Sequence, residues 1–257
     1  MTEPDDLVAE WGLRPDGDAI RSRALVLPVR TADGVCAALK IGASDHEHLV
    51  LRRWNGDGAV RLLRADPHRR ALLLERLRPQ SLQGVNDVDA CSIVAGLHQR
   101  LHVPAIPQLL SLTSLLERWA EDFASLPRSA PVPHRLVEQA TTLCRDLAGR
   151  PSDVVLHGDL HYAQVLAADR EPWLAVSPKP INGDRHFEPA PMLWHRWDEL
   201  ADNVRFGVRR RFYGLVDAAG LDEDLARAYT IVRVVREATR HPANLTTFVA
   251  LAKAIQD

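Results

Sequence analysis

The chain has 257 residues, and its content of 46% apolar and 26% charged residues is typical of an ordinary globular protein. This length fits one large domain or two lobes that share a cleft. The formal charge of −2 gives no strong overall field, so we expect neither nucleic acid nor an anionic membrane as a partner.

The N-terminal segment and the cysteines indicate a cytoplasmic protein. The chain begins MTEPDDLVAEW, which lacks the positive and apolar regions of a secretory signal, and no apolar run reaches the length of a membrane span. Cys36, Cys91 and Cys144 are widely spaced and form no Cys-x-x-Cys pair. We therefore expect three reduced, buried thiols and a cytoplasmic location.

The first third of the chain predicts a strand-rich unit with one helix. The apolar runs ALVLPV and VCAALKIG flank an Asp-Gly turn at residues 33–34, which is typical of a β-hairpin. Ser44 or Asp45 can begin a helix that continues to Trp54, where the segment NGDG breaks it. The runs AVRLL and ALLLERL predict two more strands.

Beyond Pro79 the pattern changes to helical spacing. Apolar residues recur at this spacing behind an Asn86/Asp87 cap, and further helices are expected at 111–124 and 134–149. This part of the chain is therefore predicted to be mainly helical.

A loop-rich stretch from 151 to 191 interrupts the helices. It contains the short apolar runs VVLHGDL and PWLAV, which we interpret as strands, and helical periodicity then resumes to the C-terminus. The elements predict an α+β fold with two lobes. Residues 1–77 form a small β-rich N-terminal lobe, and residues 78–257 form a larger, mainly helical C-terminal lobe.

The segment VVLHGDLHYAQVL places Asp159 in a loop after a strand, as is usual for catalytic carboxylates. Phosphoryl transfer needs a carboxylate to orient the acceptor hydroxyl, metal ions that bridge the phosphates, and a cation on the nucleotide. Asp159 stands five residues before Gln164, the spacing between base and metal ligand in a kinase catalytic loop. The alternative is that Asp159 only caps a turn and that His157 packs structurally.

Lys40 is the candidate cation. It lies in an apolar strand seven residues before Glu47, like the strand lysine and helix glutamate that hold nucleotide phosphates in kinases. The chain has only two other lysines, Lys179 and Lys253, which favours a specific role. The alternative is a lysine at a strand end whose ammonium reaches solvent.

These residues stand within longer sequence segments that resemble the streptomycin 6-kinase and hydroxyurea phosphotransferase family, within the aminoglycoside phosphotransferase group. The resemblance covers nearly the whole chain and rests on WGLRPDG, LVLPVRTADG, LKIG, HEHLVLRRWNGDGAVRLL, LLLERL, HGDLH, EPWLAVSPKP and NGDRHFEPAPMLW. It implies a kinase-like fold, ATP with magnesium as donor, and an antibiotic or related hydroxyl compound as acceptor. It also implies that Lys40 and Glu47 in the N-terminal lobe bind the nucleotide and that Asp159 is the catalytic residue.

Two departures from the family pattern concern magnesium. Gln164 stands where the motif HGDxxxxN has its asparagine ligand, and the extra methylene disturbs a small octahedral site. Ser177 stands in SPKP where the family typically has DPKP, so a neutral hydroxyl replaces the principal carboxylate ligand. Gln164 and Ser177 are therefore degenerate metal positions.

A third departure lies upstream. No glycine occurs between Gly17 and Gly34, so a glycine-rich loop cannot wrap closely around phosphates. Residues 21–23, RSR, stand there instead, either as phosphate contacts or, as we favour, as solvated surface.

Asp184 and Glu188 match acidic positions that support the catalytic loop in the family. We expect both to act as supports, and a replacement of the missing metal carboxylate by Asp184 is the alternative.

Three functions remain open from the sequence. The first is an ATP-dependent phosphotransferase for a hydroxyl of a small molecule, impaired by the altered metal positions. The second is a pseudokinase that keeps the fold and a ligand cleft without phosphoryl transfer. The third is a metallohydrolase, because His157, Asp159 and His161 alternate as metal ligands do on an extended segment, although no second His-x-His cluster accompanies them.

Overall fold

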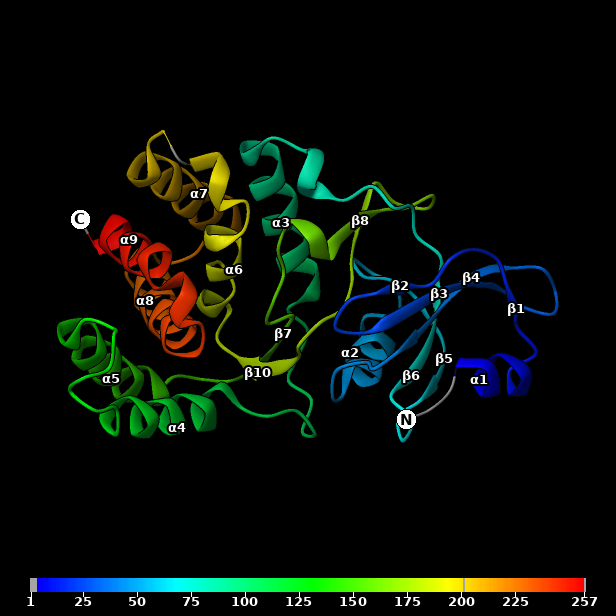
Figure 1. Ribbon diagram of the computed structural model, residues 1–257, viewed down its shortest axis with the longest axis horizontal. Coiled ribbons are helices and arrows are strands. Elements are labelled where there is room, and N and C mark those ends of the chain that lie inside the picture. The colour runs from blue at the N-terminus through cyan, green and yellow to red at the C-terminus, as the bar shows by residue number, and fades with distance from the viewer. Residues whose placement is uncertain (1–3, 201, 257) are drawn as a thin grey trace.

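The computed structural model describes residues 4–200 and 202–256, with an antiparallel sheet in the N-terminal part and helices through most of the remainder (Figure 1). The sheet has six strands: β1 (Arg14–Pro15), β2 (Ile20–Arg21), β3 (Leu25–Arg30), β4 (Cys36–Ile41), β5 (Leu62–Asp66) and β6 (Ala71–Glu75). Two helices accompany it: α1 (Pro4–Glu10) and α2 (Glu47–Trp54).

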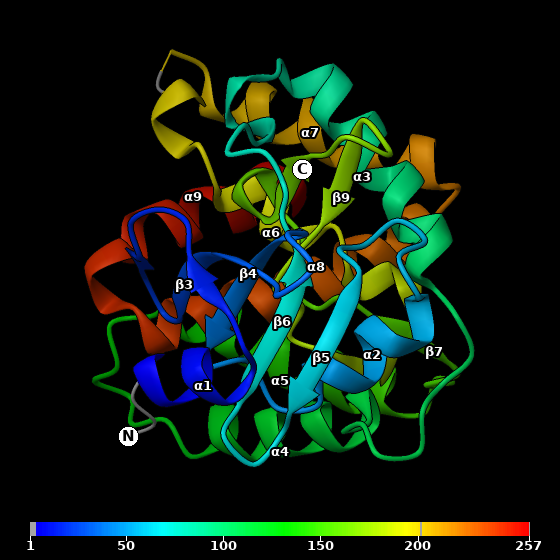
Figure 2. The ribbon, with the colours of Figure 1, turned by 90° about the vertical axis from the view of Figure 1, so that its right-hand side faces the viewer.

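The strands follow the order β1-β3-β4-β6-β5, and Figure 2 looks onto β3, β4, β6 and β5 in that order. β3 and β4 pair antiparallel from Leu25↔Ile41 to Arg30↔Cys36, which confirms the predicted hairpin. Gly34 adopts a φ of 84° in the turn, a conformation that glycine tolerates.

Both faces of the sheet are covered, which explains the uninterrupted apolar run in β6. Leu73 packs in a cluster with Leu7 and Trp11 from the α1 region, whereas Leu72 and Leu74 join the main core on the α2 side. Because successive strand residues point to opposite faces, a strand buried on both sides reads as continuous apolar sequence.

The structure differs from three local predictions, although it contains the expected helix and strand. α2 begins at Glu47 behind His46, which has a φ of 60°, and no side chain caps it, because Ser44 bonds elsewhere. β5 covers Leu62–Asp66 and so begins later than the run AVRLL. Cys36 is exposed at the start of β4, whereas the other two thiols are buried as expected.

The helical part confirms the predicted helices. Its α-helices are α3 (Asp87–Leu101), α4 (Leu112–Ala124), α5 (His134–Ala148), α6 (Ala190–Trp194), α7 (Val204–Ala219), α8 (Glu223–Arg240) and α9 (Leu245–Gln256). Asn86 caps α3 through its side chain, which accepts from the N–H of Asp89. None of the helices within 4–200 and 202–256 combines the length and apolar character needed to cross a membrane.

A two-stranded antiparallel sheet and a small hairpin lie between the N-terminal sheet and the helices (Figure 1). β7 (Val154–Leu156) pairs with β10 (Ile181–Gly183), and β8 (Val165–Ala167) pairs with β9 (Trp173–Ala175), which confirms the two short strands expected there. The short 3₁₀ segments are η1 (Leu82–Gly84), η2 (Tyr162–Gln164), η3 (Arg185–Phe187), η4 (Trp197–Leu200) and η5 (Pro242–Asn244). β9 also bridges to Ala59, so the segment after β9 runs beside the N-terminal sheet.

Candidate functional site

The loop after β7 is held from behind by buried charges. Glu188 is 1% exposed, and its carboxylate accepts from the backbone N–H groups of His157 at 2.5 Å and Gly158 at 3.1 Å. Arg233 on α8 donates to the carbonyl oxygen of Gly158 at 2.8 Å. The backbone that presents Asp159 is thus fixed by residues far along the chain, and Glu188 occupies the supporting position that we expected.

Asp159 faces a lysine. Its Oδ2 lies 2.5 Å from Nζ of Lys179, which is half-exposed. Burial opposes ionisation of Asp159, but the bond and the charge of Lys179, together with the charge of Arg233, outweigh it and hold the pKa of the carboxyl below its usual value. Gly158 allows the two segments to meet, because a Cβ there would lie 2.3 Å from the carbonyl oxygen of Lys179.

Lys40 from β4 and Glu47 from α2 form a buried ion pair. They are 5% and 0% exposed, and Nζ of Lys40 lies 2.7 and 2.9 Å from the two carboxylate oxygens of Glu47. The N–H of Ser44 donates to the same carboxylate at 3.0 Å. The ammonium is therefore held in one orientation, with Oγ of Ser177 as a further acceptor at 3.0 Å.

The segment Ser177–Lys179 connects the ion pair of Lys40 and Glu47 with the carboxylate of Asp159. Ser177 bonds Lys40 at one end, and Lys179 bonds Asp159 at the other. Between them, the carbonyl oxygen of Pro178 accepts from the hydroxyl of Ser44 at 2.5 Å. The structure thus brings Lys40 and Asp159 to the two ends of one three-residue segment.

Gln164 and Ser177, the two degenerate metal positions, are neighbours at the end of the β8–β9 hairpin. The carbonyl oxygen of Gln164 accepts from the N–H of Val176 at 2.9 Å, and Ser177 follows with a φ of 55°. Magnesium favours carboxylate oxygens in near-ideal octahedral geometry. The amide of Gln164 and the hydroxyl of Ser177, which already bonds Lys40, do not fit that set. These two positions therefore supply no charge to an ion.

Two histidines join Asp159 in a cluster, of which the sequence predicted His161 but not His195. The rings of His161 and His195 stack with centroids 3.5 Å apart, and ligand atoms of both lie within 4.8 Å of each other and of Asp159. Burial lowers the pKa of His161 to about 3, and it lowers that of His195 as well, so both rings are neutral. His157 is not a member, because its Nε2 faces the carbonyl oxygen of Val176 at 3.1 Å.

Asp184 is engaged away from the metal positions. It accepts from Nε of Arg150 at 2.7 Å and from the N–H of His186 at 3.0 Å. Burial opposes ionisation of Asp184, but its bonds with His186 and Arg150 outweigh that effect and hold its pKa well below the usual range. These contacts favour the supporting role over replacement of a metal ligand.

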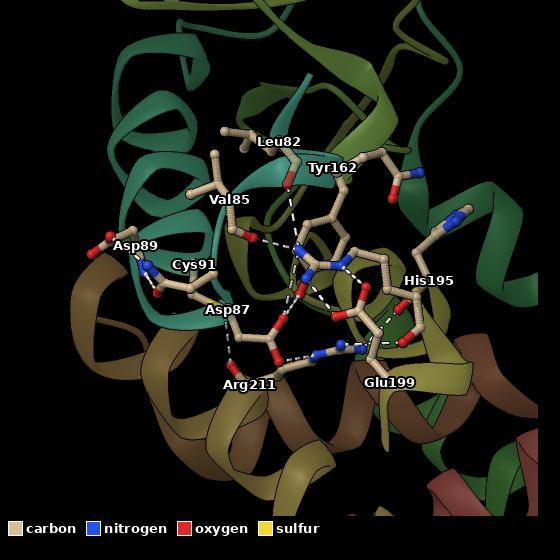
Figure 3. Close-up of polar contacts among 12 residues, drawn as sticks. Leu82, Val85, Asp87, Asp89, Cys91, Tyr162, His195, Glu199 and Arg211 are labelled. Atoms are coloured by element: carbon tan, nitrogen blue, oxygen red, sulfur yellow. Dashed lines mark hydrogen bonds and ion pairs between the residues drawn. The ribbon is translucent and has the colours of Figure 1, made fainter. Parts of the chain in front are cut away.

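A second buried network lies beneath η2 (Figure 3). Asp87, the first residue of α3, accepts from the hydroxyl of Tyr162 at 2.6 Å and from Nε of Arg211 at 2.9 Å. Arg211 also donates to the carbonyl oxygen of His195 at 2.7 Å, and Arg196 lies over the ring of Tyr162. This network fixes both ends of the histidine cluster. The sequence offered no signal for it beyond the abundance of arginine.

Comparison with known proteins agrees with this architecture. Residues 10–243 match the model of the aminoglycoside/hydroxyurea antibiotic resistance kinases. The chain is 40% identical to a streptomycin 6-kinase of Streptomyces glaucescens over 250 residues, which cover 91% of this chain and 80% of that protein. This chain belongs to the aminoglycoside/hydroxyurea antibiotic resistance kinase family.

Further comparisons support the family and its fold. The chain is 40% identical over 246 residues to a hydroxyurea phosphotransferase of Kitasatospora aureofaciens, covering 90% of this chain and 70% of that protein. An amicoumacin kinase solved with AMP-PNP, Ca²⁺ and its ligand superposes with a TM-score of 0.62 at 13% identity, covering 99% and 94% of the two chains. The fold is therefore the kinase-like fold of aminoglycoside phosphotransferases, as the sequence predicted.

Proposed function

We propose that this chain transfers the terminal phosphoryl group of ATP to a hydroxyl group of a small antibiotic-like molecule. Residues 1–77 bind the nucleotide in this proposal, and residues 78–257 bind the acceptor and carry the catalytic residue. The observation that carries the proposal is the Ser177–Lys179 segment, which connects Lys40 with Asp159. Because ATP is the donor, the activity belongs in the cytoplasm.

Asp159 is the catalytic residue in this mechanism. It accepts the proton of the acceptor hydroxyl while the acceptor oxygen bonds to the γ-phosphorus and the bond from phosphorus to ADP breaks. A carboxylate kept ionised by Lys179 orients the hydroxyl without being a strong base. That suffices, since most analyses of this transfer find little bond formation to the nucleophile.

Lys40 binds oxygens of the nucleotide phosphates. Its ammonium is held by both oxygens of Glu47, so it is already oriented before the nucleotide arrives. Glu47 also gives the buried ammonium a charged partner, and a charge buried without a partner is costly.

Gln164 and Ser177 do not fit the usual donor set of magnesium. We propose instead that Lys40 and Lys179 supply the positive charge that the transferred group meets, with only weak dependence on magnesium.

The acceptor is a hydroxyl compound of the kind handled by the relatives named streptomycin 6-kinase and hydroxyurea phosphotransferase. Both streptomycin and hydroxyurea carry hydroxyl groups, and we propose one of these chemical classes for this chain. A pseudokinase is the second candidate, favoured by the neutral side chains at Gln164 and Ser177.

Calorimetry with ATP, with and without magnesium, tests the proposal. Wild type is compared with the double variant Gln164→Asn, Ser177→Asp, and phosphate transfer to streptomycin and to hydroxyurea is followed in parallel. We expect wild type to bind ATP with little magnesium dependence, the double variant to gain that dependence, and Asp159→Asn to bind ATP but to lose transfer. Binding by the double variant alone, or binding without transfer to any hydroxyl compound, would favour the pseudokinase.

A further inference from the structure

Three side chains from two separate parts of the C-terminal region converge. Asp159 and His161 come from the loop after β7, and His195 follows α6 directly. Their ligand atoms lie within 4.8 Å of one another. His161 is buried, and the other two are partly buried, so a small ion can still reach the cluster.

The donors suit a borderline transition-metal ion. Two neutral imidazoles and one carboxylate are a common ligand set for Zn²⁺ and its neighbours, whereas magnesium prefers oxygen alone. Bonds of about 2.0–2.1 Å in a tetrahedral site place ligand atoms roughly 3.3 Å apart. Since the three groups lie within 4.8 Å of one another, they need to close by at most roughly 1.5 Å.

The ring nitrogens are available for this purpose. No group in residues 4–200 and 202–256 forms a hydrogen bond with a ring nitrogen of His195, while Nδ1 of His161 accepts only a long bond of 3.3 Å from the N–H of Ala163. The stacked rings therefore lose little when they turn toward an ion.

The backbone around the cluster is already fixed. Arg211, which is 0% exposed and bound to Asp87, donates to the carbonyl oxygen of His195 (Figure 3). Glu188 holds the loop before Asp159 through two N–H groups. Only side-chain torsions need to change on binding, which lowers the entropic cost of forming the site.

We propose that Asp159, His161 and His195 bind one divalent cation of the zinc type, and that the bound ion blocks phosphoryl transfer by occupying the carboxylate of Asp159. The binding part of this proposal is independent of the proposed function. The blocking part rests on it, since it needs Asp159 to be the catalytic residue.

Lys179 competes with the ion. Its ammonium lies 2.5 Å from Asp159, and a cation at the cluster takes over that carboxylate. Because the Lys179 side chain is 49% exposed, it can turn into solvent when the ion binds. Removal of this ammonium is therefore expected to tighten metal binding, an effect opposite to that of removing a ligand.

Titration with Co²⁺, followed by its visible absorption and reversed by Zn²⁺, measures binding directly. A Cys36→Ser background excludes the exposed thiol as a ligand. We expect one Co²⁺ per chain, at least tenfold weaker binding in His195→Gln and in Asp159→Asn, and about tenfold tighter binding in Lys179→Met. His241→Gln, at an exposed histidine at the C-terminal end of α8, is the control and should bind Co²⁺ as the background does.

The outcomes separate the two proposals. No cobalt spectrum, or equal binding by His195→Gln and the control, overturns the metal site even if the chain phosphorylates an acceptor. A site that binds Co²⁺ in a chain without transfer leaves the metal site standing and overturns the proposed function. If the chain transfers phosphate at full rate with Zn²⁺ bound, the blocking part is wrong.

Discussion

The two sides of the catalytic loop differ in how their polar groups are bonded. Behind the loop, Glu188, Arg233 and Asp87 are buried, and each bonds to partners on other elements. On the opposite side, which carries Lys179 and is called the cleft side below, Gln164 and Ser177 are partly exposed and neutral. The frame that presents Asp159 thus contains buried charged groups, whereas the two metal positions contain none. Changes behind the loop should cost stability, and changes on the cleft side should alter ligand binding.

The largest loss of stability is expected behind the loop, for the substitution Asp87→Ala. The substitution leaves the 0% exposed Arg211 without its carboxylate, and removing one partner of a buried ion pair costs about 3–5 kcal/mol. Urea unfolding measures the loss. Asp169→Ala is the control, because its pair with Arg78 is exposed and such pairs contribute about 1 kcal/mol or less. Equal losses in the two variants would contradict the distinction between the buried and the exposed side.

The next largest effect is the pH dependence of stability, which Glu188→Gln should reduce. Burial raises the pKa of Glu188 from 4.5 to about 7. Between these values the unfolded chain loses the proton and the folded chain keeps it, so the free energy of unfolding falls as the pH rises, by roughly 3 kcal/mol in total. Glutamine keeps an acceptor for the N–H groups of His157 and Gly158 but does not titrate. We expect a smaller decline from pH 5 to pH 8 in this variant.

Urea unfolding at four pH values across that range tests the prediction. Glu138→Gln on α5, at a largely exposed side chain, should decline as wild type does. A Glu188→Gln variant whose stability falls in parallel with wild type would show that this carboxyl titrates at its ordinary value in the folded chain.

Substitution by alanine should cost about 2 kcal/mol more unfolding free energy at one of two glycines of similar conformation than at the other. Gly158 and Gly34 have φ values of 79° and 84°, so alanine strains the backbone at both, by about 1–2 kcal/mol. At Gly158 the new Cβ would also meet the carbonyl oxygen of Lys179 at 2.3 Å, whereas nothing lies within 4 Å at Gly34. The difference in unfolding free energy between the two alanine variants measures the cost of this contact. Equal free energies of unfolding would show that the contact at Gly158 costs nothing.

Sequence reasoning succeeded where the signal was local. The Asp-Gly turn placed the first hairpin, Asn86 placed the start of α3, and the spacing from Lys40 to Glu47 anticipated an ion pair that the structure contains. The roles of Lys40 and Glu47 in nucleotide binding remain predictions. Local patterns suffice here because hairpins, caps and short-range pairs are determined within a few residues.

Long-range contacts could not be predicted. Asp87 meets Arg211 across 124 residues, and His161 meets His195 only because α6 ends beside the loop. In the same way, Lys179 was noticed for its rarity, but its contact with Asp159 depends on how the segment after β9 is placed. An arginine-rich chain gives each acidic residue many candidate partners, and only packing selects among them.

The smallest predicted effect belongs to the cleft side, for Lys179→Met. If the ammonium moves from Asp159 to the γ-phosphate, its loss should weaken ATP binding about tenfold, or ~1.4 kcal/mol, and leave ADP binding unchanged. Loss of the cation also raises the pKa of Asp159, so the acidic limb of the kcat/KM profile should move to higher pH. Lys253→Met on α9, at an exposed lysine, is the matched control. Equal loss of ATP and ADP affinity would mean that Lys179 contacts no γ-phosphate, and an unmoved pH profile would mean that it does not govern the catalytic carboxylate.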